Sequence, residues 1–170
     1  MVKNILAKKP KKIIFISSMT VYPNIKHRLA YTEDALLPDQ LIGYAKYKRL
    51  AELSIIQNRQ LTGYCILRLP GLFGQNRKSG VLYNYLHSIR SGHEFELSEG
   101  LPHWSTIHVL DAAEAVANIY TKSSLEQKEI LNIAYSGPMS IPAAINQLAV
   151  LLGVEPQYVE PEGFQLDIQP

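Results

Sequence analysis

This chain of 170 residues has few features that would place it outside a reducing, aqueous compartment. Cys65 is its only cysteine, so no disulfide can form within the chain. No apolar run approaches the roughly 18 to 20 residues that a membrane-spanning helix needs. The basic start followed by Ile13 to Ile16 is also too short for the ~7 to 15 apolar residues of a secretory signal. We therefore expect a soluble, cytoplasmic protein with no membrane partner.

An excess of charge of one sign is also missing. The sequence has 17 basic and 15 acidic side chains, which leave a net charge of +2 at neutral pH. Much of this excess lies near the amino end, in Lys3, Lys8, Lys9, Lys11 and Lys12. Away from these lysines the balance of charge predicts no nucleic-acid partner.

Short apolar blocks alternate with helical patterns along the chain. Strands are predicted at 13–16, 64–69 and 130–134, half-exposed strands at 93–97 and 106–109, and helices at 44–60, 81–90, 111–120 and 140–153. The block 13–16 is unbroken and β-branched, which is typical of a strand buried on both faces of a parallel sheet. Strands that alternate with helices imply right-handed βαβ units, so the fold class is α/β. Between 20 and 43 we expect a long loop, and after 153 little packed structure.

Tyr44 and Lys48 form the clearest chemical pattern. They are four residues apart at the start of a predicted helix, so both side chains share one face. A lysine cation beside a tyrosine favours the phenolate, which can then take a proton from a hydroxyl while a nicotinamide takes the hydride. Such a pair also occurs on ordinary solvated helix faces. A second signal is Ser17-Ser18, which directly follows a predicted buried strand, where a parallel sheet presents side chains to ligands.

Several segments occur in an order that matches a known pattern. They are Ile16-Ser17-Ser18-Met19-Thr20-Val21-Tyr22, Tyr44-Ala45-Lys46-Tyr47-Lys48, Leu67-Arg68-Leu69-Pro70-Gly71-Leu72-Phe73-Gly74, Ile107-His108-Val109-Leu110-Asp111 and Leu131-Asn132-Ile133-Ala134. This order resembles the extended short-chain dehydrogenases/reductases of the NAD-dependent epimerase/dehydratase type. The resemblance covers roughly residues 11 to 153. It implies the second half of a Rossmann-like doubly wound parallel sheet, with part of a small α+β substrate domain.

The resemblance also implies domains and site residues. Residues 11–75 and 128–136 would form the NAD(P)-binding part, and 76–127 and 137–170 the partial substrate domain. The catalytic residues would be Ser18, Tyr44 and Lys48. The cofactor, NAD or NADP, would contact Ser17, Tyr44, Lys48 and Pro70. The substrate would contact Met19, Thr20, Gly71 and Trp104. The implied substrate is a nucleotide sugar or a similar hydroxyl or carbonyl compound. Many nucleotide-sugar members have an arginine where this chain has Trp104, which leaves other substrates open. No metal site is predicted.

The family's glycine-rich turn, G-x-x-G-x-x-G, is not found before Ser18. That turn lets a helix approach the cofactor pyrophosphate, so we expect the residues above to face only the nicotinamide end. In the strand order 3-2-1-4-5-6, the strand at 13–16 would be the fourth, without strand one beside it. The open edge predicts self-association through residues 13–17. Two hypotheses remain: an NAD(P)-dependent oxidoreductase, or an inactive truncated remnant that acts as an interaction module.

Overall fold

The computed structural model describes residues 2–23, 31–96, 103–122, 127–136, 139–155 and 158–159. Its elements are α1 (Val2–Leu6), β1 (Lys12–Ser18), the 3-10 turn η1 (Met19–Val21), α2 (Gly43–Ile56), β2 (Gly63–Leu69), β3 (Gly71–Phe73), α3 (Val81–Ser91), β4 (Phe95–Glu96), β5 (His103–Trp104), β6 (Thr106–His108), α4 (Val109–Lys122), β7 (Lys128–Asn132), β8 (Met139–Ser140), α5 (Ile141–Leu152) and β9 (Tyr158–Val159). Strands and helices alternate as expected, so the α/β fold class is confirmed. The short elements α1, β3, β5, β8 and β9 were not predicted.

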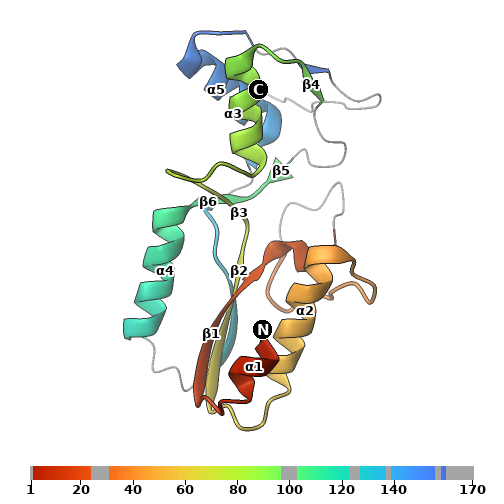
Figure 1. Ribbon diagram of the computed structural model, residues 1–170, viewed down its shortest axis with the longest axis vertical. Coiled ribbons are helices and arrows are strands. Elements are labelled where there is room, and N and C mark those ends of the chain that lie inside the picture. Colours follow the sequence, from red (N-terminus) through yellow and green to blue (C-terminus); the bar gives the residue numbers. More distant parts are fainter. Residues whose placement is uncertain are drawn as a thin grey trace.

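The main sheet consists of three parallel strands in the order β1-β2-β7. Helices α1 and α2 lie on one face of this sheet and α4 lies on the other (Figure 1). The order corresponds to strands four, five and six of a dinucleotide-binding fold. Among the described residues β1 pairs only with β2, so β1 is an edge strand.

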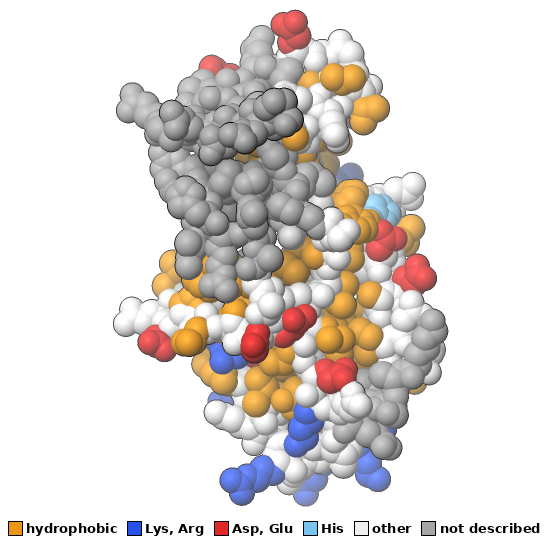
Figure 2. Space-filling view, turned by 180° about the vertical axis from the view of Figure 1, so that it is seen from behind, with side chains coloured by type: hydrophobic (Ala, Val, Ile, Leu, Met, Phe, Trp, Pro, Cys, Tyr) orange, Lys and Arg blue, Asp and Glu red, His pale blue; other side chains and the backbone are white. Residues whose placement is uncertain are grey.

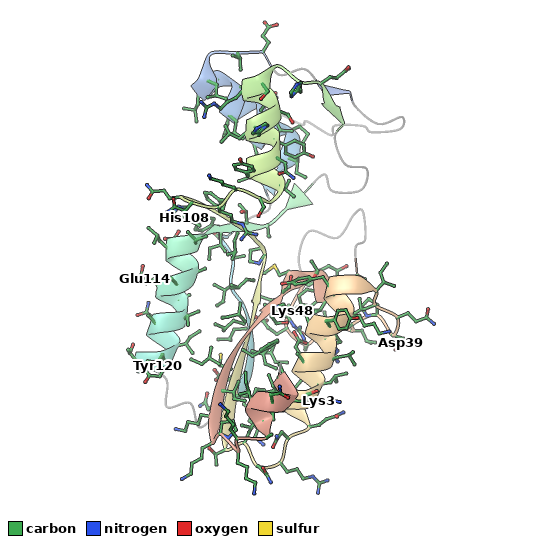
Figure 3. All side chains as sticks on the ribbon, in the orientation of Figure 1. Lys3, Asp39, Lys48, His108, Glu114 and Tyr120 are labelled. Carbon is green, nitrogen blue, oxygen red and sulfur yellow. The ribbon has the colours of Figure 1, made fainter. Side chains whose placement is uncertain are left out.

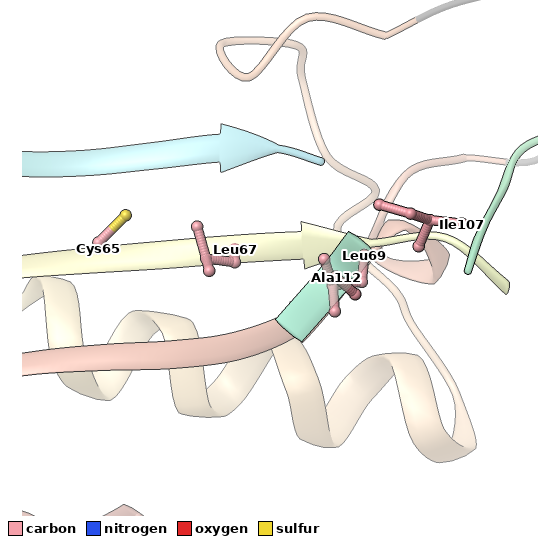
Figure 4. Close-up of a cluster of buried hydrophobic side chains, with 5 residues drawn as sticks. All are labelled: Cys65, Leu67, Leu69, Ile107 and Ala112. Carbon is pink, nitrogen blue, oxygen red and sulfur yellow. The ribbon is translucent and has the colours of Figure 1, made fainter. Parts of the chain in front are cut away.

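Side chains of the sheet alternate between two apolar clusters, as the period of two in a strand requires. On the α4 face the buried members are Cys65, Leu67, Leu69, Ile107 and Ala112 (Figure 4). On the α1 and α2 face they are Ile55, Leu61, Tyr64 and Ile66, against which the two helices place further half-buried apolar residues. The sheet therefore has an apolar layer on each side.

The two neighbouring strands β1 and β2 differ in burial. All seven residues of β2 are buried, whereas in β1 only Ser17 is buried and Ile16 is 37% exposed. The prediction that the block 13–16 is buried on both faces is therefore wrong. Its apolar side chains do pack into both clusters, but the described residues place a neighbouring strand on only one edge of β1.

Helices α3 and α5 pack against each other at the end of the molecule towards which β1, β2 and β7 run (Figure 1). Their shared cluster contains Tyr85, Ile89, Ile141 and Ile145. Between them and the main sheet, β3 pairs in parallel with β6. The predicted division of the chain into two domains stays a prediction. None of the helices in the described ranges is both long and apolar enough to cross a membrane.

The lysines of the amino end lie where the strands of the main sheet begin. Lys8, Lys9, Lys11 and Lys12 are all exposed, and Figure 2 shows Lys and Arg side chains gathered at this end of the molecule. Ser18 lies at the opposite end of β1. The basic cluster is thus separated by the length of a strand from the predicted site.

Candidate active site

Ser18 ends β1 and caps the turn η1. Its backbone is extended, and its Oγ accepts hydrogen bonds from the Thr20 backbone N at 3.2 Å and from Thr20 Oγ1 at 3.0 Å. Met19, predicted to contact substrate, begins η1, and Thr20 is exposed. Because both hydrogen bonds are accepted by Ser18, its own hydroxyl proton is left for another acceptor.

Tyr44 and Lys48 lie one turn apart on α2. Gly43 directly before them has φ +52°, a left-handed conformation that favours glycine, and it turns the chain into the helix. Tyr44 is 61% exposed, and Lys48 Nζ lies 5.4 Å from the centre of its ring. The same Nζ donates a hydrogen bond of 2.8 Å to the carbonyl oxygen of Ile16 in β1. Figure 3 labels Lys48 on α2. The two predicted residues are therefore adjacent, with the ammonium held against the edge strand.

Ser18 is not joined to Tyr44 or Lys48 by any hydrogen bond in the part of the chain that the structure describes. All three nevertheless lie on elements that meet, because α2 packs against both β1 and η1. Their catalytic roles stay a prediction. The geometry brings together a phenol and an ammonium on α2 and a hydroxyl at the end of β1.

The segment after β2 carries two more predicted residues. Pro70 is half-buried between β2 and β3, and the carbonyl oxygen of Gly71 accepts a 2.7 Å hydrogen bond from Thr106 Oγ1. This contact fixes β3 beside β6. Trp104 lies in β5, and its side chain is outside the described part of the structure.

A buried charged cluster lies directly behind the site, and the sequence interpretation assigned no role to it. Glu52 and Arg68 are 0% and 1% exposed. Arg68 donates two hydrogen bonds to the Glu52 carboxylate, from Nε to Oε1 at 3.1 Å and from Nη2 to Oε2 at 3.0 Å. Ser17 Oγ donates to Oε1 at 2.5 Å and Arg49 Nη1 to Oε2 at 3.1 Å. The predicted cofactor contact of Ser17 stays a prediction, and its hydroxyl is bound to Glu52.

The environment of this pair favours the charged forms of both partners. Burial would raise the pKa of Glu52, but the hydrogen bonds from Arg68 and Ser17 and the positive charge of Arg68 outweigh it, so the pKa is lowered. Burial opposes the charge of Arg68 in the same way, yet the contacts with Glu52 raise its pKa. Glu52 and Arg68 are therefore an ion pair at neutral pH.

The cluster extends to the carboxyl end of β7. Arg68 Nη1 donates to Tyr22 Oη at 2.8 Å, and Tyr22 Oη donates to Asn132 Oδ1 at 2.8 Å. The Asn132 backbone N donates to Glu33 Oε1 at 2.8 Å. One sequence signal did point to it, since an arginine within the otherwise apolar strand β2 needs a buried partner.

A second polar group lies at the start of α4. His108 Nδ1 accepts from the backbone N of Leu110 at 3.3 Å, and the side chain of Asp111 accepts a hydrogen bond from Tyr135 Oη. This hydrogen bond to Asp111 raises the pKa of Tyr135. Helix α4 begins at Val109, two residues before the predicted start at 111, and His108 makes the capping contact. Gly74 has φ +137°, and a Cβ there would lie 2.6 Å from His108 Nε2.

The parallel sheet, with a hydroxyl, a phenol and an ammonium where its strands end, defines an α/β protein with the architecture of a dinucleotide-binding fold. The sequence matches the model of the NAD dependent epimerase/dehydratase family over residues 1–134. The chain belongs to this family, so the resemblance inferred from the sequence is confirmed. A comparison with curated protein sequences finds no match.

Solved structures share the fold. dTDP-glucose 4,6-dehydratase from Bacillus anthracis, solved with NAD, is 18% identical with a TM-score of 0.76, covering 94% of this chain and 53% of that one. UDP-glucuronic acid 4-epimerase from Bacillus cereus, with UDP-glucuronic acid and NAD, is 20% identical with a TM-score of 0.77, covering 94% and 52%. UDP-N-acetylglucosamine 4-epimerase from Methanobrevibacter ruminantium is 21% identical with a TM-score of 0.72, covering 96% and 56%. This chain thus spans about half the length of these structures.

Proposed function

We propose that this chain carries the proton-transfer part of an NAD(P)-dependent epimerase, dehydratase or reductase that acts on a nucleotide sugar or a similar hydroxyl or carbonyl substrate. The observation that carries the proposal is the Lys48 ammonium 5.4 Å from the Tyr44 ring centre, beside the end of β1, in a member of the epimerase/dehydratase family. The cytoplasm is the proposed location, because the chain has one cysteine, which is buried.

Each of the three residues has a distinct task. Lys48 stabilises the phenolate of Tyr44, and Tyr44 Oη takes the proton of the substrate hydroxyl. Ser18 orients the reacting oxygen by donating its own hydroxyl proton, which its contacts with Thr20 leave available. When bound, the nicotinamide cofactor accepts or returns the hydride. The proton therefore moves through Tyr44.

The residues present fit the nicotinamide end of such a cofactor. Lys48 uses one of its three N–H donors for Ile16, and two are left for ribose hydroxyls. Pro70 and Gly71 border the same end of the sheet through β3, so we propose Pro70 as a cofactor contact and Gly71 as a substrate contact. Met19 and Thr20 in η1 and Trp104 in β5 complete the proposed substrate contacts. Residues 76–127 and 137–170 are the proposed partial substrate domain.

Comparison of Tyr44→Phe with Tyr47→Phe tests the mechanism. Tyr47 is 72% exposed on the same helix, so its substitution removes an equal hydroxyl without touching the proposed site. Turnover would be followed by chromatography of the sugar products, because an epimerase or dehydratase returns the hydride and accumulates no NADH. UDP-glucose, dTDP-glucose and UDP-glucuronic acid would be the substrates. We expect Tyr44→Phe to lower turnover about 10²-fold or more and Tyr47→Phe to leave it unchanged. Equal turnover by both variants would contradict the role of Tyr44.

A second candidate is an interaction module that acts without turnover. The edge of β1 that has no strand beside it among the described residues favours this candidate. The apolar side chains Ile13, Ile14 and Phe15 are only half-buried, and an unpaired strand edge is a template for another chain. We propose that residues 13–17 pair with a second copy of the chain. Absence of turnover with all three sugars, together with a concentration-dependent dimer in sedimentation velocity, would favour this candidate over the first.

A further inference from the structure

One row of polar residues crosses the main sheet just below the site. The register aligns Ser17 of β1 with Arg68 of β2 and Arg68 with Asn132 of β7. Two positions earlier, the same face has an apolar row made of Phe15, Ile66 and Ile130. This row belongs to the apolar cluster between the sheet and α2, here called the cluster under α2. The sheet therefore changes from apolar to hydrogen-bonded contacts at its last row, next to Ser18.

The Glu52 carboxylate joins this row to α2. It accepts from Ser17, the residue before Ser18, and from Arg68, which lies two residues before Pro70. Glu52 itself lies one turn after Lys48 and two turns after Tyr44 on α2. A single buried carboxylate thus contacts or belongs to all three segments that carry the proposed site.

The polar contacts between α2 and the sheet are few. Within the described ranges, every side-chain hydrogen bond from α2 to a strand of the main sheet is made by Glu52 or by Lys48. The apolar contacts of α2 with the sheet, through Ile55 and Ile56, are not directional. Apart from the hydrogen bond of Lys48 itself, the directional contacts between α2 and the described main sheet are those of Glu52.

Stability alone gives little reason for such a pair. Removing water from two charges costs much of what their attraction returns, and apolar side chains of similar volume are often as stable or more stable. Both charges here are fully hydrogen-bonded, and no buried polar side-chain atom of the described residues lacks a partner. The directionality of the pair, rather than its free energy, distinguishes it from an apolar contact.

We propose that Glu52 and Arg68 are a positioning pair for the site: they fix α2 on the ends of β1 and β2 and thereby hold Lys48 and Tyr44 in place relative to Ser18. The inference rests on the proposed function for the meaning of the site, but its geometric consequence can be measured without turnover. Neither residue touches the substrate or the cofactor in this role. Displacement of a reacting group by about 1 Å can cost up to 10²-fold in rate, so such a device matters to catalysis.

The decisive variant is the double substitution Glu52→Leu with Arg68→Met. It removes both charges while keeping similar volumes, so the chain is expected to stay folded. The first readout is the set of nuclear Overhauser effects from the Lys48 side chain to the Phe15 and Tyr44 rings, whose centres lie 5.3 and 5.4 Å from Nζ. We expect these signals to fall to less than about half of their wild-type intensity, because the close contacts that produce them depend on a fixed α2. Unchanged intensities in a folded double variant would overturn the proposal.

The second readout is the dissociation constant for NAD, measured by equilibrium titration. A positioning role predicts an increase of about tenfold in the double variant, as is typical when residues that orient a binding group are removed. A merely structural role predicts no change, since loss of folded protein alters the amplitude of the titration and not the dissociation constant. Glu114→Gln, on the exposed surface of α4, is the matched control and should change neither readout.

Failure of the inference can be told apart from failure of the proposed function. If the wild-type chain does not bind NAD, the proposed function is wrong, while the Lys48 signals still test the positioning. If the wild-type chain binds NAD and the double variant binds it equally well with unchanged Lys48 signals, the positioning pair is wrong and the function stands. Glu52→Gln alone adds a graded test: it keeps an acceptor for Ser17 but leaves Arg68 without its counter-charge, and we expect an intermediate loss of the Lys48 signals.

Discussion

β1 and β2 are neighbouring parallel strands of seven residues each, and both have an apolar middle, yet they meet very different surroundings. β2 has a strand on each edge and a helical layer on each face, and all its residues are buried. Among the described residues β1 has a strand on one edge only, and just one of its residues is buried. Burial of a strand thus depends on its neighbours as much as on its own sequence.

The largest expected difference between the two strands is in the cost of removing apolar atoms. Ile16 and Leu67 are register partners that are 37% and 0% exposed. We expect Leu67→Ala to lower the free energy of unfolding by about 2–5 kcal/mol, because it leaves a cavity in the core. Ile16→Ala should cost about 1 kcal/mol or less, since part of this side chain is already in water. Urea unfolding measures both, and equal costs would remove the distinction between the strands.

Acid should weaken the link between the two strands. Despite burial, Arg68 and Ser17 lower the pKa of Glu52 in the folded state. The charged carboxylate therefore stabilises the fold above the unfolded-state pKa of about 4.3, and this stabilisation is lost as the pH falls through the lower folded-state pKa. We expect the free energy of unfolding to fall steeply below about pH 4.3. Glu52→Gln should flatten this dependence, and Glu114→Gln should not. A pH profile that Glu52→Gln leaves as steep as before would show that the carboxylate does not stabilise the fold in its charged form.

Thiol reactivity compares the two strands at another pair of register partners, Ile14 and Cys65. Burial, and then the negative charge of Glu129, raise the pKa of the Cys65 thiol, which is 2% exposed. Both effects slow its reaction with Ellman's reagent. We expect Ile14→Cys in a Cys65→Ala background to react at least about tenfold faster than the native thiol, since Ile14 is only half-buried in the edge strand. A slower reaction at position 14 would mean that the edge is covered in solution.

A charge added to the edge strand β1 is expected to change the free energy of unfolding least of all, but to change self-association clearly. Ile16→Lys adds a cation to the exposed part of β1 and should change the free energy of unfolding by no more than about 1 kcal/mol. It should nevertheless suppress a dimer that forms through residues 13–17. Leu36→Lys, at a loop residue that is 91% exposed, is the matched control. Sedimentation velocity that finds the same dimer for both variants would exclude β1 as the contact.

Local sequence patterns predicted most of the strands and helices. The apolar runs of β1, β2 and β7 and the helical spacing of α2 to α5 identified these elements because their apolar faces pack onto the sheet. The helix α1 has only five residues, of which Val2 and Leu6 pack onto the cluster under α2, so its stability depends on contacts distant in sequence. β3 likewise depends on its pairing with β6.

The site was predictable where its residues are close in sequence. Tyr44 and Lys48 could be placed together because a helix joins them, and Ser18 because it directly follows a strand. The contacts of Glu52 with Ser17 and Arg68 join residues 35 and 16 positions apart. The register of β1 on β2 places Ser17 beside Arg68, and the packing of α2 against the sheet brings Glu52 to both. The strand order predicted that β1 lies at an edge, and in the described ranges it pairs with β2 alone. The effect of this edge on the burial of residues 13–16 was not predicted.

Titration of the 170-residue chain with NAD and NADP is the most direct test of the central claim, that Lys48 beside Tyr44 forms the nicotinamide end of a dinucleotide site. We expect saturable binding by the wild-type chain that Lys48→Ala weakens at least about tenfold, because an ammonium contact to the cofactor is lost. Lys46→Ala removes an exposed lysine from the same helix and should leave the dissociation constant unchanged. Equal weakening by both substitutions, or no binding by the wild-type chain, would contradict the claim.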